Sequence, residues 1–165
     1  MLNDVRIIEF SPEYAEAAKD LLVELQTHIS ASDKFGIVVM KDDFRNAYFD
    51  FLTAEIKKQS GKIFLALKGN RAVGLIVCKI FRGGSEADIT TVCPKIGFIS
   101  DLIVTESERG RGIGKMLLER TERYFNDCGC DYAQLEVSAQ NTAAAELYDK
   151  AGYEPYCVYM IKKRR

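Results

Sequence analysis

The sequence contains one histidine, His28, and its five cysteines do not have the spacing of a metal site. Cys128 and Cys130 form C-x-C rather than the C-x-x-C typical of zinc ligands, so no metal is expected. An odd number of cysteines, with no apolar signal segment after Met1, favours a reduced, cytoplasmic setting. The apolar runs fall short of the ~18 residues of a membrane-spanning helix, so no membrane partner is expected.

The sequence also lacks an excess of charge of either sign. Lysine and arginine number 23 and aspartate and glutamate 24, which gives a formal net charge of -1. Such a balance favours neither nucleic acid nor an anionic membrane as partner. The basic residues 162–165 are a local exception, and charges at a terminus more often solubilise the chain than bind a partner. We therefore expect no nucleic-acid partner.

No internal repeat, low-complexity stretch or long polar linker interrupts the chain, so residues 1–165 are expected to form a single domain. Hydrophobic periodicity predicts a strand at 5–10 and then two amphipathic helices, joined by a loop near 30–41. Ser11 and Pro12 are typical of a helix N-cap and first turn. The aromatic stripe of the second helix, which includes Phe44, Tyr48 and Phe51, is assigned to packing.

The second half of the chain alternates between strand and helix patterns. Strands are predicted at 62–67, 72–80 and 95–104 as an antiparallel meander, with a break at Gly83-Gly84. A helix at 112–127, a strand at 132–137, a helix at 142–151 and a closing strand at 153–162 are predicted to follow. The expected fold is therefore α/β, with a mixed, mostly antiparallel central sheet flanked by about four helices.

A glycine-rich turn, Arg109 to Lys115, leaves a buried strand and enters a helix. Glycines let the backbone approach a phosphate closely, and the helix N-terminus adds partial positive charge, so the turn is suited to bind an anion. Arg109 and Arg111 add donors for phosphate oxygens. The alternative is a plain helix entry with solvated arginines. Lys115, Met116 and Leu117 break the spacing of a dinucleotide fingerprint or a Walker A loop, which disfavours a nucleotide-binding protein.

Two motifs resemble those of the GNAT superfamily of N-acetyltransferases. Arg109-x-x-Gly112-x-Gly114 is similar to its acetyl-CoA signature, and Asn141, Leu147-Tyr148 and Gly152-Tyr153 match its later motif in order and spacing. The resemblance spans roughly residues 62–159. It implies acetyl-CoA as cosubstrate and a protein able to form a homodimer. The coenzyme-binding residues it implies are Leu102, Ile103, Val104, Arg109, Gly110, Arg111, Gly112, Ile113, Gly114, Lys115, Asn141 and Tyr148.

Asp101 is the candidate catalytic base or amine anchor. It is a carboxylate within the apolar run 98–104, and a carboxylate on a buried strand usually has either a paired partner or a catalytic function. A purely structural carboxylate is the alternative. Ser100 stands where some relatives carry their acid, and Glu136 or a water path are the other candidates for the base. His28 is interpreted as a packed or surface side chain rather than an acceptor-site residue.

Tyr148 matches the family's general acid, which would protonate the departing CoA thiolate; packing on the last strand is its structural alternative. Asn141 is expected to cap its helix, to contact the pantetheine, or both. The expected reaction is direct attack of a primary amine on the thioester. The acceptor, whether a small molecule, an amino acid or a peptide terminus, leaves no signature in the sequence. A non-catalytic acyl-CoA-binding or sensing module is the alternative function.

Overall fold

The computed structural model describes residues 4–82 and 92–164, and within these ranges five strands form one mixed sheet with four α-helices around it. The predicted α/β fold is confirmed. The expected break at Gly83-Gly84 lies outside the described residues. The strands are β1 (Val5–Glu9), β2 (Lys62–Lys68), β3 (Arg71–Arg82), β4 (Lys95–Val104) and β5 (Tyr132–Leu135). The helices are α1 (Ala15–Ser32), α2 (Phe44–Lys58), α3 (Ile113–Asp127) and α4 (Thr142–Lys150), with short 3-10 turns η1 (Pro12–Tyr14) and η3 (Glu106–Glu108).

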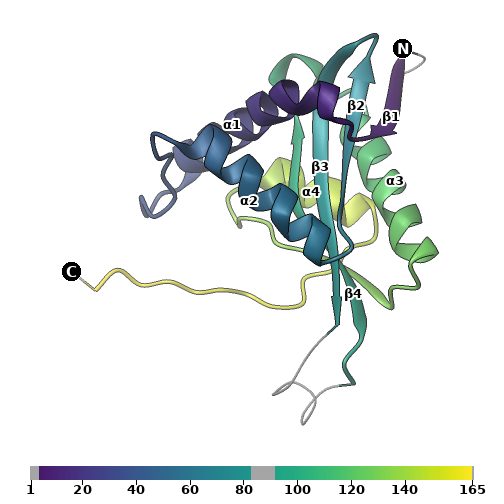
Figure 1. The fold of residues 1–165 in the computed structure, drawn as a ribbon. Helices are drawn as coiled ribbons and strands as arrows, with labels where there is room; N and C mark the ends of the chain where they lie inside the picture. Colours follow the sequence, from purple (N-terminus) through teal and green to yellow (C-terminus); the bar gives the residue numbers. More distant parts are fainter. Residues whose placement is uncertain (1–3, 83–91, 165) are drawn as a thin grey trace.

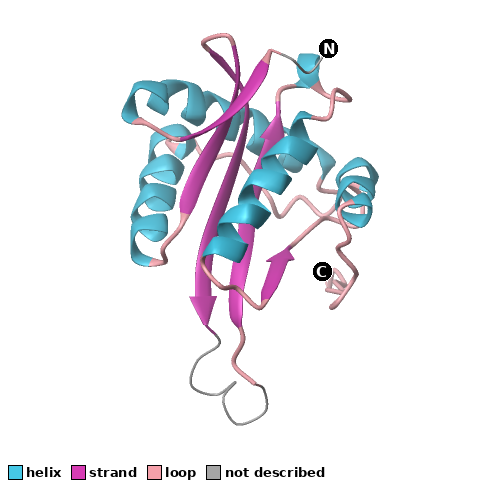
Figure 2. Cartoon of the chain, turned by 90° about the vertical axis from the view of Figure 1, so that its right-hand side faces the viewer, coloured by secondary structure: helices cyan, strands magenta, loops and turns pink. Residues whose placement is uncertain are grey.

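The strands lie in chain order, β1-β2-β3-β4-β5. The antiparallel pairing of β2, β3 and β4 confirms the predicted meander; β1 also pairs antiparallel, with β2, whereas β5 runs parallel to β4. The pairing of β4 with β5 is short and covers only Ile96–Ile99 against Tyr132–Leu135. In Figure 2 the small arrow of β5 stands beside the much longer strands of the meander. The two strands therefore stay together at one end of the sheet only.

Helices cover both faces of the sheet (Figure 1). On one face α1 and α2 bury a core with Leu65, Leu75, Val77 and Ile103, and on the other α3 packs on residues that include Phe64, Val73 and Ile99. The side chains of α4 also contact this second core. None of the described helices is long and apolar enough to cross a membrane.

The helix ends follow the local signals of the sequence. Ser11 precedes η1 with Pro12 at its first position, and η1 leads directly into α1. Gly129 and Gly152 follow α3 and α4 with φ of 66° and 89°, the left-handed conformation that glycine adopts without strain.

The predicted closing strand at 153–162 does not form. Residues 154–164, here called the tail segment, make no hydrogen bond to another described residue and leave the body as an extended trace (Figure 1). The apolar pattern of this segment suits a strand, but a strand requires a neighbour for its N–H and C=O groups, and none lies beside it. The strand at 132–137 is likewise shorter than predicted and ends at Leu135.

Candidate functional site

A β-bulge at Ser100 decides which way the candidate base points. Val77 on β3 pairs with Asp101 and the next residue, Cys78, pairs with Ile99, so Ser100 is an extra residue in β4. Because side chains alternate along a strand, one inserted residue moves those that follow to the opposite face. Ile99 accordingly packs in the core beneath α3, whereas Ile103 packs in the core beneath α1 and α2. Asp101 is thereby turned toward α2.

Asp101 is buried, with 6% of its surface exposed, and two hydroxyl groups donate hydrogen bonds to it. Tyr48 Oη lies 2.8 Å from Oδ1 and Ser100 Oγ lies 2.7 Å from Oδ2. Burial raises the pKa of the Asp101 carboxyl above its ordinary value, and the hydrogen bonds from Ser100 and Tyr48 oppose this rise. A carboxylate whose pKa moves toward neutrality is better suited to accept a proton than an exposed aspartate.

Tyr48 is the residue of this site that the sequence did not reveal. Its ring lies in an aromatic row on α2, 4.9 Å from the ring of Phe44 and 6.3 Å from that of Phe51. Packing accounts for the ring, as predicted, but the hydroxyl binds Asp101. Burial and the nearby Asp101 raise the pKa of Tyr48, so it stays a proton donor in this hydrogen bond. A tyrosine among phenylalanines was the only sequence signal for this role.

Beyond Ile99, the edge of β4 that faces β5 is unpaired. The ladder to β5 stops at Ile99, whereas the ladder to β3 continues to Val104. The backbone groups of 100–104 that point away from β3 therefore have no strand partner. Such an edge can bind a ligand that carries amide groups, in the way an added strand would.

The glycine-rich turn continues from this free edge. After η3 the chain passes Gly110 and Gly112 with φ of 73° and 78°, and Gly112 is the N-cap of α3. The first amides of a helix have no acceptor within it, so those of Ile113, Gly114 and Lys115 are directed out of the N-terminus. Together with the helix dipole they form a site for a phosphate group.

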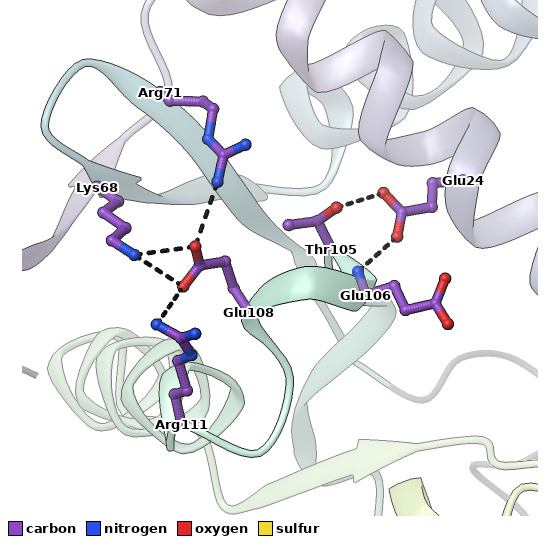
Figure 3. A network of polar contacts seen from close by, with 7 residues as sticks. All are labelled: Glu24, Lys68, Arg71, Thr105, Glu106, Glu108 and Arg111. Carbon is purple, nitrogen blue, oxygen red and sulfur yellow. Dashed lines mark hydrogen bonds and ion pairs between the residues drawn. The ribbon is translucent and has the colours of Figure 1, made fainter. Parts of the chain in front are cut away.

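Two carboxylates hold this turn in place (Figure 3). Glu108 is buried and ion-paired with Lys68 and Arg71 of the β2–β3 hairpin, at 2.9 and 3.2 Å, and with Arg111 at 3.2 Å. The Lys68 ammonium is the main cause that lowers the pKa of Glu108. From α1, Glu24 accepts hydrogen bonds from Thr105 Oγ1 and Glu106 N, both at 2.9 Å. The turn is thus tied to both the hairpin and α1.

The two arginines of the turn are themselves engaged with protein groups. Arg109 Nε donates to the carbonyl of Val104 at 2.9 Å, and its guanidinium lies 3.7 Å from Glu24. Arg111 pairs with Glu108. Both side chains remain partly exposed, so their charge still reaches a phosphate at the turn. The Arg109 amide donates to the carbonyl of Glu106 at 3.3 Å, so the backbone amides of residues 110–115 are the groups of the turn that are free to donate directly.

Helix α4 lies against the same turn. A Cβ placed on Gly114 would come within 3.1 Å of Leu147 Cδ2 and 3.9 Å of Val104 Cγ2, so glycine permits the close approach of α4. Tyr148 packs on the core that contains Ile113, and the partly buried Leu102 and Val104 pack on the same core. Asn141 caps α4 by accepting from Ala144 N at 3.1 Å. The structure therefore brings the end of β4, the turn and Tyr148 together.

The Tyr148 phenol is suited to donate a proton. Its hydroxyl has no hydrogen-bond partner among the described residues, and burial raises its pKa, so it is protonated at neutral pH. It lies on the face of the sheet covered by α3, opposite to the face on which Asp101 meets α2. The ladder between β4 and β5 ends at Ile99, which leaves a gap between these strands at the level of Asp101.

Other residues lie outside this arrangement. Glu136 is exposed after β5, and His28 is exposed on α1. A hollow of about 630 Å³ lies between α1 and the β2–β3 hairpin, but neither Asp101 nor Tyr148 lines it. No group of three metal-ligating side chains occurs among residues 4–82 and 92–164.

The chain belongs to the acetyltransferase (GNAT) family, whose family model matches residues 22–153. It is 31% identical over 110 residues to the N-alpha-acetyltransferase MAK3 of Arabidopsis thaliana, a match that covers 67% of this chain and 50% of that protein. It is also 31% identical over 109 residues to glucosamine 6-phosphate N-acetyltransferase 1 of Dictyostelium discoideum, covering 64% and 65%. The chain thus matches about half to two thirds of the length of these relatives.

Solved structures share the fold. A mutant of the BH1408 protein of Bacillus halodurans superposes with a TM-score of 0.85 at 19% identity, covering 97% of this chain and 99% of the other. The aminoglycoside N-acetyltransferase AAC(6')-Iy, in complex with a bisubstrate analogue built on CoA, gives 0.72 at 18% identity, with 98% of both chains covered.

Proposed function

We propose that the protein transfers an acetyl group from acetyl-CoA to a primary amine. The observation that carries the proposal is the unpaired edge of β4 beyond Ile99, which runs into the turn at the N-terminus of α3. The pantetheine amides would bind the backbone of Leu102, Ile103 and Val104, and the pyrophosphate would bind the turn, residues 109–115, through the free amides of 110–115. Membership of the acetyltransferase (GNAT) family supports this use of the site.

In the proposed reaction the amine approaches from the α2 face, where Asp101 lies. Its nitrogen attacks the thioester carbonyl, the C–S bond breaks, and the amine's proton passes to the Asp101 carboxylate directly or through water. The CoA thiolate takes a proton from the Tyr148 phenol. Asp101 and Tyr148 lie on opposite faces of the sheet, which suits a substrate that crosses the gap between β4 and β5.

The acceptor is proposed to be the primary amine of a small molecule, an amino acid or a peptide. Among the relatives, the plant protein is named an N-alpha-acetyltransferase and the Dictyostelium protein acts on glucosamine 6-phosphate. Peptide α-amines and amino sugars are therefore the first acceptors to test. The setting that we propose is the cytoplasm, where five cysteines would stay reduced.

The experiment combines binding and turnover. Calorimetry with acetyl-CoA should give binding well below ~1 mM, and a panel of peptides, amino acids and amino sugars should release free CoA with at least one acceptor. No binding at ~1 mM would refute the proposal. Tight binding with no acetyl transfer to any amine, and no thioester hydrolysis, would favour the acyl-CoA-binding module instead.

A further inference from the structure

Lys79 on β3 is a partly buried lysine that the proposed reaction does not use. Its ammonium forms no ion pair within the part of the chain that the structure describes. Its Nζ lies 5.7 Å from the centre of the Phe98 ring, a cation–π distance. Lysine side chains are mostly exposed, and buried ones are usually paired with a carboxylate. The positive charge of Lys79 is therefore available to a ligand.

The register of β3 with β4 places Lys79 on the same face of the sheet as Asp101. Val77 pairs with Asp101 and packs in the core beneath α1 and α2, and Lys79 follows two residues later, so its side chain returns to the face of Val77. Diagonal neighbours on one face of an antiparallel pair lie about 7–8 Å apart, which a long side chain can span. The positive charge of Lys79 is one of the causes that oppose the rise in the pKa of Asp101 on burial.

Aromatic rings accompany Lys79 on this face of the sheet. Phe98 is its pairing partner on β4, and the Phe98 ring lies 6.2 Å from that of Phe81, the next residue of β3 on the same face. Both phenylalanines are partly exposed. Figure 1 shows α2 crossing this face, with β3 and β4 running on past it. A substrate whose amine reaches Asp101 from the α2 side would therefore meet one cation and two apolar rings.

We propose that Lys79 binds an anionic group of the acceptor while the acceptor's amine lies at Asp101. The inference rests on the proposed function and narrows its substrate class to amines that carry a carboxylate or a phosphate near the nitrogen, as a free α-amino acid or an amino sugar phosphate does. A peptide N-terminus lacks this anion, because its α-carboxyl group is in an amide, and a polycationic acceptor is repelled by the lysine. Holding the acceptor at both groups orients its amine for attack.

Matched acceptors test the preference for an anion. The release of CoA is compared for α-amino acids and their carboxamides, and for glucosamine 6-phosphate and glucosamine, with rates referred to the concentration of free amine. In at least one pair kcat/KM should be tenfold or more higher for the anionic member, since a hydrogen bond to a charged group contributes about that factor. The pair that shows the preference distinguishes a carboxylate from a phosphate. Transfer to both members at equal kcat/KM in every pair would overturn the inference alone, whereas no transfer to any amine would refute the proposed function and the inference together.

Substitution of Lys79 tests whether its charge causes the preference. Lys79→Met keeps an unbranched chain against the Phe98 ring but removes the charge, so KM for the anionic acceptor should rise about tenfold or more. The kcat/KM for its neutral counterpart should stay nearly unchanged, and Lys79→Arg should retain most of the preference. The control Lys19→Met removes a lysine of α1 that lies 5.5 Å from the Phe49 ring, and it should leave the preference intact. An equal fall in kcat/KM for anionic and neutral acceptors in Lys79→Met would overturn the inference, because the lysine would then act only through Asp101.

Discussion

The Asp101 carboxylate depends on two hydroxyl donors, Tyr48 Oη and Ser100 Oγ. Burial raises its pKa, while hydrogen bonds to the ionised form lower it, and the balance sets the pH at which it becomes a base. Tyr48 contacts the carboxylate and, in the proposed reaction, no reacting atom. It is therefore a positioning residue whose effect should appear in the pH dependence.

Tyr48→Phe keeps the ring in its row between Phe44 and Phe51 but removes one donor from Asp101. The pKa of Asp101 should then rise further, so less of it is ionised at a given pH and the acid limb of kcat/KM moves to higher pH. A hydrogen bond to a charged group suggests a shift of roughly one pH unit. The pH–rate profile is compared with that of Tyr14→Phe, a tyrosine without contact to Asp101. An unshifted limb would mean that Asp101 is not the base.

Tyr148→Phe separates catalysis from coenzyme binding. The ring packs on the core beside α3 and the hydroxyl binds no described residue, so folding and acetyl-CoA affinity should stay nearly unchanged. Loss of the proton donor should slow the acetyl-transfer step, toward the low end of the ~10²- to 10⁴-fold typical of general acid catalysis, since a thiol is a fairly acidic leaving group. Calorimetry measures the acetyl-CoA affinity, and a single-turnover assay on the same preparation measures the rate of acetyl transfer. Full activity would exclude the acid role; affinity and transfer falling together would assign Tyr148 to the shape of the pocket.

At the scale of elements, the turn before α3 is held by two carboxylates. Glu108 and Glu24 tie it to the β2–β3 hairpin and to α1, so its shape is set before any ligand arrives. Prearranged donors bind an anion at lower entropic cost than a loop that must order.

Gly112→Val should weaken acetyl-CoA binding at least tenfold, because a branched side chain at φ of 78° strains the turn and its Cβ blocks the approach of a phosphate. Gly129→Val is the matched control. It has φ of 66° at the other end of α3, and a Cβ added there would meet nothing within 4 Å, so it carries similar backbone strain away from the site. Calorimetry should show weak binding for Gly112→Val alone. Equal losses in the two variants would place the pyrophosphate elsewhere.

At the scale of the whole molecule, α3 is seated on the sheet by close contacts to glycines. A Cβ at Gly97 on β4 would lie 2.4 Å from the Phe125 ring, and one at Gly74 on β3 would lie 3.2 Å from Leu117 Cδ1. These glycines let α3 approach β3 and β4, and Gly97 lies in the part of β4 that pairs with β5.

Gly97→Ala should therefore lower the free energy of unfolding by about 1–3 kcal/mol, since the Phe125 ring must move. Phe125→Leu in the same chain should recover part of the loss, because the smaller side chain leaves room for the methyl group. Denaturant unfolding of the two single variants and the double variant forms the cycle. Purely additive losses would contradict a direct clash between the two residues.

Much of the fold was predictable because its signals are local. The meander, the helices and the helix ends at Gly129 and Gly152 follow from periodicity and capping residues within a few positions. The turn at Arg109 to Lys115 was equally visible, since strand, glycines and helix follow one another in the chain. The closing strand at 153–162 failed for the opposite reason, as a strand is completed by a partner that its own residues do not specify.

The sequence by itself determined the helices and the first four strands, the acetyltransferase (GNAT) motifs and the burial of Asp101. Tertiary structure alone decided the bulge at Ser100, which turns Asp101 toward α2, and the bond from Tyr48, 53 residues away along the chain. It also decided that Arg109 and Arg111 pair with Glu24 and Glu108, and where β5 leaves β4. The physical reason is common to all of these. Strand register and side-chain partners depend on how distant segments pack against one another. The sequence pattern of one segment reports only the local preference of that segment for helix, strand or turn.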